Sequence, residues 1–270
     1  MDHQRFGARI AADYDRGAPQ YRHDDEIEVR SENHQRLGGN LRRICRSLSH
    51  PVRVLELGCG TGRYFHWLDN VDLLVGTDIS AEMLKQAEHP VLENEVTARE
   101  VRLIRGNLYE ISFEPGSFDF IYSLGVLGYG AALTDELGQR LAHWLAPGGR
   151  LYFDAIEKRE MGRLHRFKQS LKASVLPVLP GAIQRKAAAR ANAGVPVFNH
   201  TRAEIERVMA KAGFQDFVVS SNTCQSPLWT GMHLECSARK TDTKARPAET
   251  RLAMDQTMVT TAEPRGGGLG

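Results

Sequence analysis

The sequence predicts an α/β fold built on a doubly wound, mostly parallel sheet. An apolar segment, 54–57, runs directly into three alternating glycines. A second apolar segment, 72–78, ends in a carboxylate and precedes residues with a helical pattern. Further short apolar segments follow at 101–104, 117–123 and 150–153. Short apolar strands separated by crossover-length connections are typical of parallel sheets covered by helices.

Length, charge and cysteine content narrow the class of protein. The 270 residues suffice for one large α/β domain, and the formal net charge of +2 gives no whole-chain reason to expect nucleic acid or an anionic membrane as partner. No apolar run approaches the ~20 residues that cross a bilayer, and no apolar signal segment follows Met1–Arg5. We therefore expect a cytoplasmic protein without a transmembrane segment.

The cysteines are far apart and form no C-x-x-C pair. They are Cys45, Cys59, Cys224 and Cys236. This spacing indicates neither a zinc site nor a disulfide framework, so we expect no metal.

The glycines after the first strand predict a nucleoside-binding turn followed by a helix. Gly58, Gly60 and Gly62 allow backbone angles that other residues avoid, and they let a ligand approach bare main chain. The dinucleotide fingerprint G-x-G-x-x-G would need glycine at position 63, where Arg63 stands, which disfavours NAD and FAD. The absence of G-x-x-x-x-G-K-[ST] disfavours an ATP or GTP phosphate loop.

The strand ending in Glu56, followed by G-x-G-x-G, resembles motif I of the class I S-adenosylmethionine-dependent methyltransferases. Segments similar to the second to fifth strands of that family follow in the correct order, so the resemblance covers roughly residues 50–155. It implies a Rossmann-like, mostly parallel seven-stranded sheet and S-adenosylmethionine as the cofactor.

The resemblance also implies a set of cofactor-binding residues. The glycine loop would lie along the amino-acid moiety, and Asp78 would accept hydrogen bonds from both ribose hydroxyls. Asn107 and Leu108 would border the adenine; many family members have aspartate at position 107, but an amide oxygen can also accept from the adenine amino group. The implied cofactor-binding residues are Glu56, Gly58, Cys59, Gly60, Asp78, Ile79, Met83, Asn107, Leu108, Ser123 and Tyr21.

Five segments are expected along the chain. They are an N-terminal helical lid (1–50), the cofactor-binding core (51–156), a basic helical cap inserted after the fifth strand (157–198), a helix with two edge strands of the same core (199–239) and a disordered tail (240–270).

Two of these segments carry further expectations. Tyr14 and Tyr21 in the lid would share one face of a continuous helix, but Gly17 and Pro19 argue against continuity. Thr201 with Glu204 forms a capping box that begins the helix of the last core segment, and the two strands after it predict an antiparallel hairpin at one edge of the sheet.

The insertion between 157 and 190 is strongly basic. We expect two helices there, joined by a proline turn, either as a solvated cap or as a cover that attracts an anionic acceptor. Two acidic residues, Glu157 and Glu160, stand against nine basic ones, Lys158, Arg159, Arg163, Arg166, Lys168, Lys172, Arg185, Lys186 and Arg190.

The end of the fourth strand, 123–129, narrows the acceptor class. It lacks the Asn/Asp-Pro-Pro-aromatic motif for nucleobase amines, the Pro-Cys nucleophile for cytosine and the paired glutamates for arginine, which disfavours DNA and leaves a small molecule. Tyr129 and Asp154 are the candidate substrate residues, because both follow strands whose carboxyl ends form α/β sites. His165, His200 and His233 are candidate bases by residue type alone.

The sequence therefore predicts an S-adenosylmethionine-dependent methyltransferase that acts by in-line transfer to a small-molecule acceptor. Two alternatives stay open: a catalytically inactive binding protein of the same fold, and an RNA-associated methyltransferase that uses the basic insertion. The acceptor, the methylated atom (O, N, S or C), the catalytic residue and the oligomeric state are not assigned.

Overall fold

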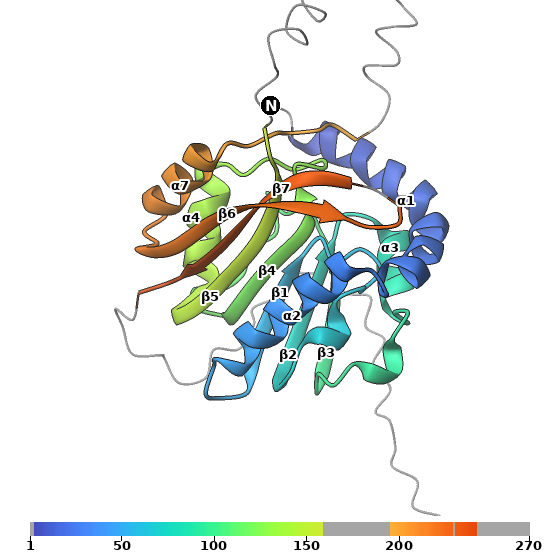
Figure 1. Cartoon of the computed structure of the whole chain (residues 1–270), viewed down its shortest axis with the longest axis horizontal. Helices are drawn as coiled ribbons and strands as arrows, with labels where there is room; N and C mark the ends of the chain where they lie inside the picture. The colour runs from blue at the N-terminus through green and yellow to red at the C-terminus, as the bar shows by residue number, and fades with distance from the viewer. Residues whose placement is uncertain (1–2, 159–194, 229, 242–270) are drawn as a thin grey trace, which may run out of the picture.

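The computed structural model describes residues 3–158, 195–228 and 230–241 (Figure 1). Seven strands form one sheet of order β3-β2-β1-β4-β5-β7-β6, parallel except for β7, which runs antiparallel to both β5 and β6. The predicted fold class is confirmed. The strands are β1 (Val52–Leu57), β2 (Val71–Asp78), β3 (Glu100–Arg105), β4 (Phe118–Leu127), β5 (Leu145–Ile156), β6 (Asp216–Gln225) and β7 (Thr230–Arg239).

Helices cover both faces of the sheet and its carboxyl edge (Figure 1). Side chains alternate along β1, so Leu55 and Leu57 join the core beneath α4 and α7, whereas Val52 and Val54 join the core beneath α2. The helices are α1 (His3–Glu28), α2 (Glu32–Arg46), α3 (Ala81–Ala87), α4 (Asp135–Trp144) and α7 (Arg202–Lys211), with 3-10 turns η1 (Phe65–Trp67) and η2 (Glu93–Glu95).

The strand register brings residues that are distant in the sequence to one edge of the sheet. The parallel strands all finish at the same edge, where α/β folds form their ligand sites. Because β7 is antiparallel, its first residues reach that edge too, and His233 pairs with Ile156 at the end of β5.

The expected break in the N-terminal helix is wrong. A single helix, α1, runs through Gly17 and Pro19, with Ala18 buried and the rings of Tyr14 and Tyr21 5.9 Å apart. Proline inside a helix removes one hydrogen bond at a cost of about 3 kcal/mol. Packing of α1 against α3 and the rest of the domain offsets that local cost.

The helix expected directly after the glycines is also wrong. Only turns and the 3-10 turn η1 lie between β1 and β2, because Phe65 and Leu68 enter the core immediately. The site therefore has no helix N-terminus at this point, and its donors are the loop amides themselves.

The two C-terminal expectations are confirmed. Thr201 caps α7 with the reciprocal capping box to Glu204, and β6 and β7 form an antiparallel hairpin at one edge of the sheet. The predicted helices of the basic insertion lie almost wholly outside the described residues, as does nearly all of the predicted disordered tail.

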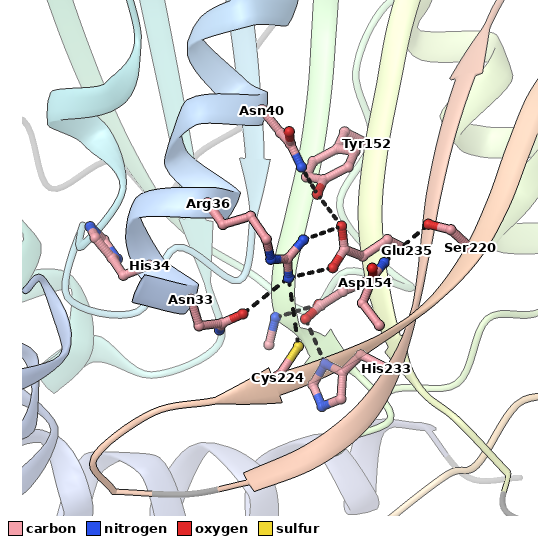
Figure 2. Close-up of polar contacts among 12 residues, drawn as sticks. Asn33, His34, Arg36, Asn40, Tyr152, Asp154, Ser220, Cys224, His233 and Glu235 are labelled. Atoms are coloured by element: carbon pink, nitrogen blue, oxygen red, sulfur yellow. Dashed lines mark hydrogen bonds and ion pairs between the residues drawn. The ribbon is translucent and has the colours of Figure 1, made fainter. Parts of the chain in front are cut away.

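An ion pair between a half-exposed arginine and a buried carboxylate links α2 to β7 (Figure 2). The Arg36 guanidinium lies 2.6 Å and 2.9 Å from the two carboxylate oxygens of Glu235, which also accepts a hydrogen bond of 2.7 Å from the Tyr152 hydroxyl. The Glu235 side chain is only 6% exposed, so its charge depends on these partners.

We expect Arg36→Met to destabilise the fold by about 3 kcal/mol, because it leaves the Glu235 carboxylate buried without a cation. Urea unfolding measures the loss, with the exposed Arg43→Met on the same helix as control. Adding Glu235→Gln should recover much of the loss. Equal stability of the Arg36→Met and Arg43→Met variants would contradict the assignment.

Candidate active site

A cavity of about 560 Å³ lies at the carboxyl edge of the sheet. Its walls come from α1, the ends of β1 and β2, the loops after β3 and β4, the segment at Phe198 and the start of β7. This volume is within the ~300–1,000 Å³ of small-molecule sites. The cavity therefore joins segments from both ends of the chain.

The glycine loop exposes bare main chain to this cavity. Gly58, Gly60 and Gly62 have φ of 71°, 53° and 76°, a region that side chains disfavour. A Cβ on Gly60 would meet nothing within 4 Å, whereas one on Gly58 would lie 2.3 Å from Val126. The loop thus requires glycine for two reasons: backbone conformation throughout and close packing at Gly58.

Asp78 at the end of β2 fastens the glycine loop. One carboxylate oxygen accepts from the amide of Gly60 and the other from the amide of Ser80, each at 2.9 Å. Burial raises the pKa of Asp78, against the lowering effect of these amides. Each oxygen keeps a second lone pair, so the carboxylate can also accept from ligand hydroxyls.

Glu56 lies buried beneath the same loop. Its carboxylate accepts a hydrogen bond of 2.6 Å from the Tyr122 hydroxyl, and burial raises its pKa to about 8. A carboxyl group with this pKa can respond to a cationic ligand by losing its proton near neutral pH.

The helix α1 is fastened across the loop. Asp25 accepts from Thr61 and pairs with Arg63 at 3.1 Å, and Asp15 accepts from the Ser80 hydroxyl at 2.6 Å. Glu28, one turn after Asp25, lines the cavity, and its buried Oε1 has no hydrogen-bond partner within the described chain. A ligand donor would satisfy that oxygen.

Ten of the residues expected to contact the cofactor line this one cavity. They are Tyr21, Glu56, Gly58, Cys59, Gly60, Asp78, Ile79, Met83, Asn107 and Leu108. The eleventh, Ser123, is not among the lining residues: it is buried inside β4, and its hydroxyl donates to the carbonyl of Leu57 at 2.9 Å. Its assignment as a cofactor residue is corrected, because a buried hydroxyl bonded to the neighbouring strand does not reach the cavity.

The two expected substrate residues are placed differently. Tyr129 lines the cavity, whereas Asp154 is buried and is not among the lining residues. The expectation that Asp154 contacts the substrate directly is therefore corrected. One Asp154 oxygen accepts from the Gly125 amide at 2.7 Å and the other contacts His233 Nδ1 at 2.8 Å. Both oxygens are engaged within the protein.

The three histidines named as candidate bases differ in their position relative to the cavity. His233 lines the cavity beside Tyr129, with ring centroids 6.2 Å apart. His200 accepts from the Leu133 amide at 3.0 Å, and burial lowers its pKa, so it is a structural residue. His165 lies outside the described residues.

Sequence reasoning missed Asp25 and Glu28 among the lining residues. They follow Tyr14 and Tyr21 at spacings of seven, four and three, the pattern of one helix face, but this pattern is recognised only if the helix passes through Pro19. For His233, the predicted antiparallel hairpin was the usable signal, since it brings the start of the last strand to the carboxyl edge.

The described chain contains no helix of the length and apolarity needed to cross a bilayer. Within the same residues, no group of three or more histidine, cysteine or acidic side chains is arranged to hold a metal ion.

Residues 54–149 match a family model described as a methyltransferase domain. The chain is 28% identical over 160 residues to malonyl-[acyl-carrier protein] O-methyltransferase of Enterobacter lignolyticus, covering 58% of this chain and 57% of that protein. It is 33% identical over 111 residues to demethylmenaquinone methyltransferase of Lactiplantibacillus plantarum, covering 38% and 45% respectively. The match thus spans about half the length of these curated relatives.

Among solved structures, the fold is similar to phosphoethanolamine N-methyltransferase 2 of Haemonchus contortus in complex with phosphomonomethylethanolamine and S-adenosylhomocysteine. The TM-score is 0.53 at 18% identity, and the match covers 76% of this chain and 52% of that one. At this identity the similarity shows the fold alone.

We expect Asp78→Ala to weaken S-adenosylhomocysteine binding by roughly 2–4 kcal/mol, because it removes the proposed acceptor of the ribose hydroxyls and loosens Gly60. Calorimetry measures the change, with Asp72→Ala, at the partly exposed start of β2, as control. Unchanged affinity in a folded Asp78→Ala protein would remove the ribose assignment.

The raised pKa of Glu56 predicts a pH-dependent stability. A carboxyl group with pKa about 8 when folded and ~4.5 when unfolded binds more proton in the folded state between these values, so stability falls as pH rises from 4.5 to 8. Glu56→Gln removes this loss, on the order of a few kcal/mol. The melting temperature of the ligand-free variant should therefore exceed that of the wild type at pH 8 by roughly 5 °C more than at pH 5.

The exposed Glu114→Gln is the control for that comparison and should leave the pH dependence unchanged. If the melting temperatures of wild type and Glu56→Gln change by the same amount between pH 5 and pH 8, the pKa of Glu56 is not raised in the folded protein.

Proposed function

We propose that this chain, whose residues 54–149 match a methyltransferase domain, is a class I S-adenosylmethionine-dependent methyltransferase that transfers a methyl group to a small-molecule acceptor by in-line displacement. One observation carries the proposal. The open main chain at Gly60, the carboxylate of Asp78 and the side chain of Tyr129 line a single cavity.

The cavity residues fit the cofactor part by part. The glycine loop would lie along the amino-acid moiety, Asp78 would accept from the ribose hydroxyls, and Asn107 with Leu108 would border the adenine. The unpartnered oxygen of Glu28 would accept from the cofactor's ammonium group. The remaining contacts would come from Tyr21, Glu56, Cys59, Ile79 and Met83.

The charge of the lining also supports this cofactor. When bound, S-adenosylmethionine supplies an activated methyl group on a positively charged sulfur. Carboxyl groups outnumber guanidinium groups on the described walls, which favours a cationic ligand. The carboxyl side chains are Asp24, Asp25, Glu28, Glu56 and Asp78, against Arg63.

The chain itself would orient the acceptor and exclude water. The helix α1 lies over the glycine loop through the Asp25–Arg63 contact, and the segment at Phe198 pairs with that at Tyr129, closing another wall. Restricting the acceptor to one orientation is the main contribution a protein makes to an in-line displacement.

The acceptor is proposed only as a small molecule. The names of the relatives point to malonyl-[acyl-carrier protein] and demethylmenaquinone as their acceptors, which differ in chemistry. A preference for an anionic acceptor rests on the basic insertion and stays a prediction, because carboxyl groups outnumber guanidinium groups on the described walls. The cytoplasmic location also stays a prediction.

Two measurements on the full chain test the function. Calorimetry with S-adenosylmethionine and S-adenosylhomocysteine should show binding, and labelled methyl from the former should appear in one or a few compounds of a small-metabolite extract. Asp78→Ala should reduce both. Failure to bind either nucleoside would overturn the proposal, and binding without transfer to any extract would favour the non-catalytic alternative. Transfer to RNA alone would favour the RNA-associated alternative.

A further inference from the structure

We propose that His233, oriented by Asp154, is the general base that removes the proton from the methyl acceptor, and that this acceptor is a ring-bearing molecule with a phenolic or enolic hydroxyl. The inference rests on the proposed methyltransferase function and deepens it, since that function alone leaves the acceptor atom open.

The two side chains form an oriented pair (Figure 2). Asp154 Oδ2 lies 2.8 Å from His233 Nδ1, and both side chains are nearly buried. A carboxylate can only accept, so Nδ1 carries the hydrogen and Nε2 is the basic nitrogen of the neutral ring. Figure 2 shows the second ring nitrogen on the side of the ring away from Asp154.

The pair lies on the acceptor side of the cavity. Glu56 and Asp78 lie at the ends of β1 and β2, and the loop that contains Asn107 follows β3. These three strands form one half of the sheet, and β4, β5 and β7 lie on the other side of β1. A cofactor held over β1 to β3 leaves the space above β4, β5 and β7 for the acceptor. His233, at the start of β7, borders that space.

Asp154 also fixes the loop that faces the acceptor. Its other oxygen accepts from the amide of Gly125, whose φ is 72°. The same carboxylate therefore positions both His233 and the loop leading to Tyr129, which makes Asp154 a positioning residue. A carboxylate serving only one of them would not couple the base to the acceptor loop.

The neighbouring side chains indicate the class of acceptor. Burial, and then the charge of Asp154, raise the pKa of Tyr129, so its hydroxyl stays protonated and can donate to an acceptor oxygen. Tyr129, Phe198 and Leu228 are among the residues that line the cavity, and they offer apolar contact to a ring. A carboxylate acceptor would need no base, whereas a hydroxyl acceptor does.

The step balances without a further reactant. A lone pair of the acceptor oxygen forms the new O–CH₃ bond, and the C–S bond breaks with its electron pair going to sulfur. The O–H proton moves to Nε2 of His233. The resulting imidazolium is stabilised by Asp154, and the proton then leaves to solvent as the products depart.

The first test needs no knowledge of the acceptor. In the full chain with labelled histidine, the ring signals of His233 are recorded by NMR with S-adenosylmethionine and with S-adenosylhomocysteine. Only the former carries a positively charged sulfur, so the His233 ring signals should differ between the two complexes. Asp154 contacts His233 in both complexes, so the difference reports the sulfonium.

His50, which precedes β1 at the opposite edge of the sheet, is the internal control, and its ring signals should be the same in both complexes. The experiment distinguishes failure of the methyltransferase proposal from failure of the His233 inference. If neither nucleoside binds, the methyltransferase proposal is overturned. If both bind and the His233 ring signals are the same in the two complexes, only the present inference is overturned.

A variant pair provides the second test. His233→Gln keeps a donor for Asp154, so cofactor affinity should stay within about twofold. The acceptor panel holds phenols together with carboxylic acids, amines and thiols, and transfer of labelled methyl to the phenols should fall by ~10²- to 10⁴-fold. His50→Gln should retain full transfer. Equal transfer by His233→Gln and wild type, or transfer by the wild type only to carboxylic acids, amines or thiols, would overturn the inference. If no panel member is methylated, the NMR comparison decides.

Discussion

The hydrogen bonds accepted by the carboxylate of Asp78 hold together the two segments on which the cavity depends. Its oxygens bind the amides of Gly60 and Ser80, one on the loop after β1 and the other at the start of α3. A loop with three left-handed glycines has many accessible conformations, so a fixed acceptor is needed to select one. The same carboxylate then faces the cavity, and structure and proposed ligand binding share one group.

The second constraint is the position of α1. Asp25 contacts Thr61 and Arg63 on the glycine loop, and Asp15 contacts Ser80 beside Asp78. The helix is therefore fastened to the same two segments that Asp78 joins. Any ligand of the glycine loop lies under α1, and residues that line the cavity also hold its cover in place. Movement of this cover would break charged hydrogen bonds, which makes closure and ligand contact interdependent.

Asp154 has a comparable role in the other half of the cavity. It lies on β5 and contacts Gly125 of β4 and His233 of β7, so it connects three adjacent strands at their common edge. The two halves differ in character. The β1 to β3 half offers carboxylates and open main chain, whereas the other half offers an oriented imidazole, a phenol and apolar side chains. This asymmetry is consistent with the proposed reaction between a cationic methyl donor and a ring-bearing acceptor.

The sequence by itself determined the sheet, the glycine loop and the strand-end carboxylate, because these depend on local backbone angles, apolar periodicity and residues that follow strands directly. Only the tertiary structure decided which side chains reach the cavity. Packing carried α1 through Pro19, and Ser123 was bonded to a neighbouring strand. Asp154 lay behind His233, a partner 79 residues later in the chain. Such contacts depend on strand register across the whole sheet, which no local pattern specifies.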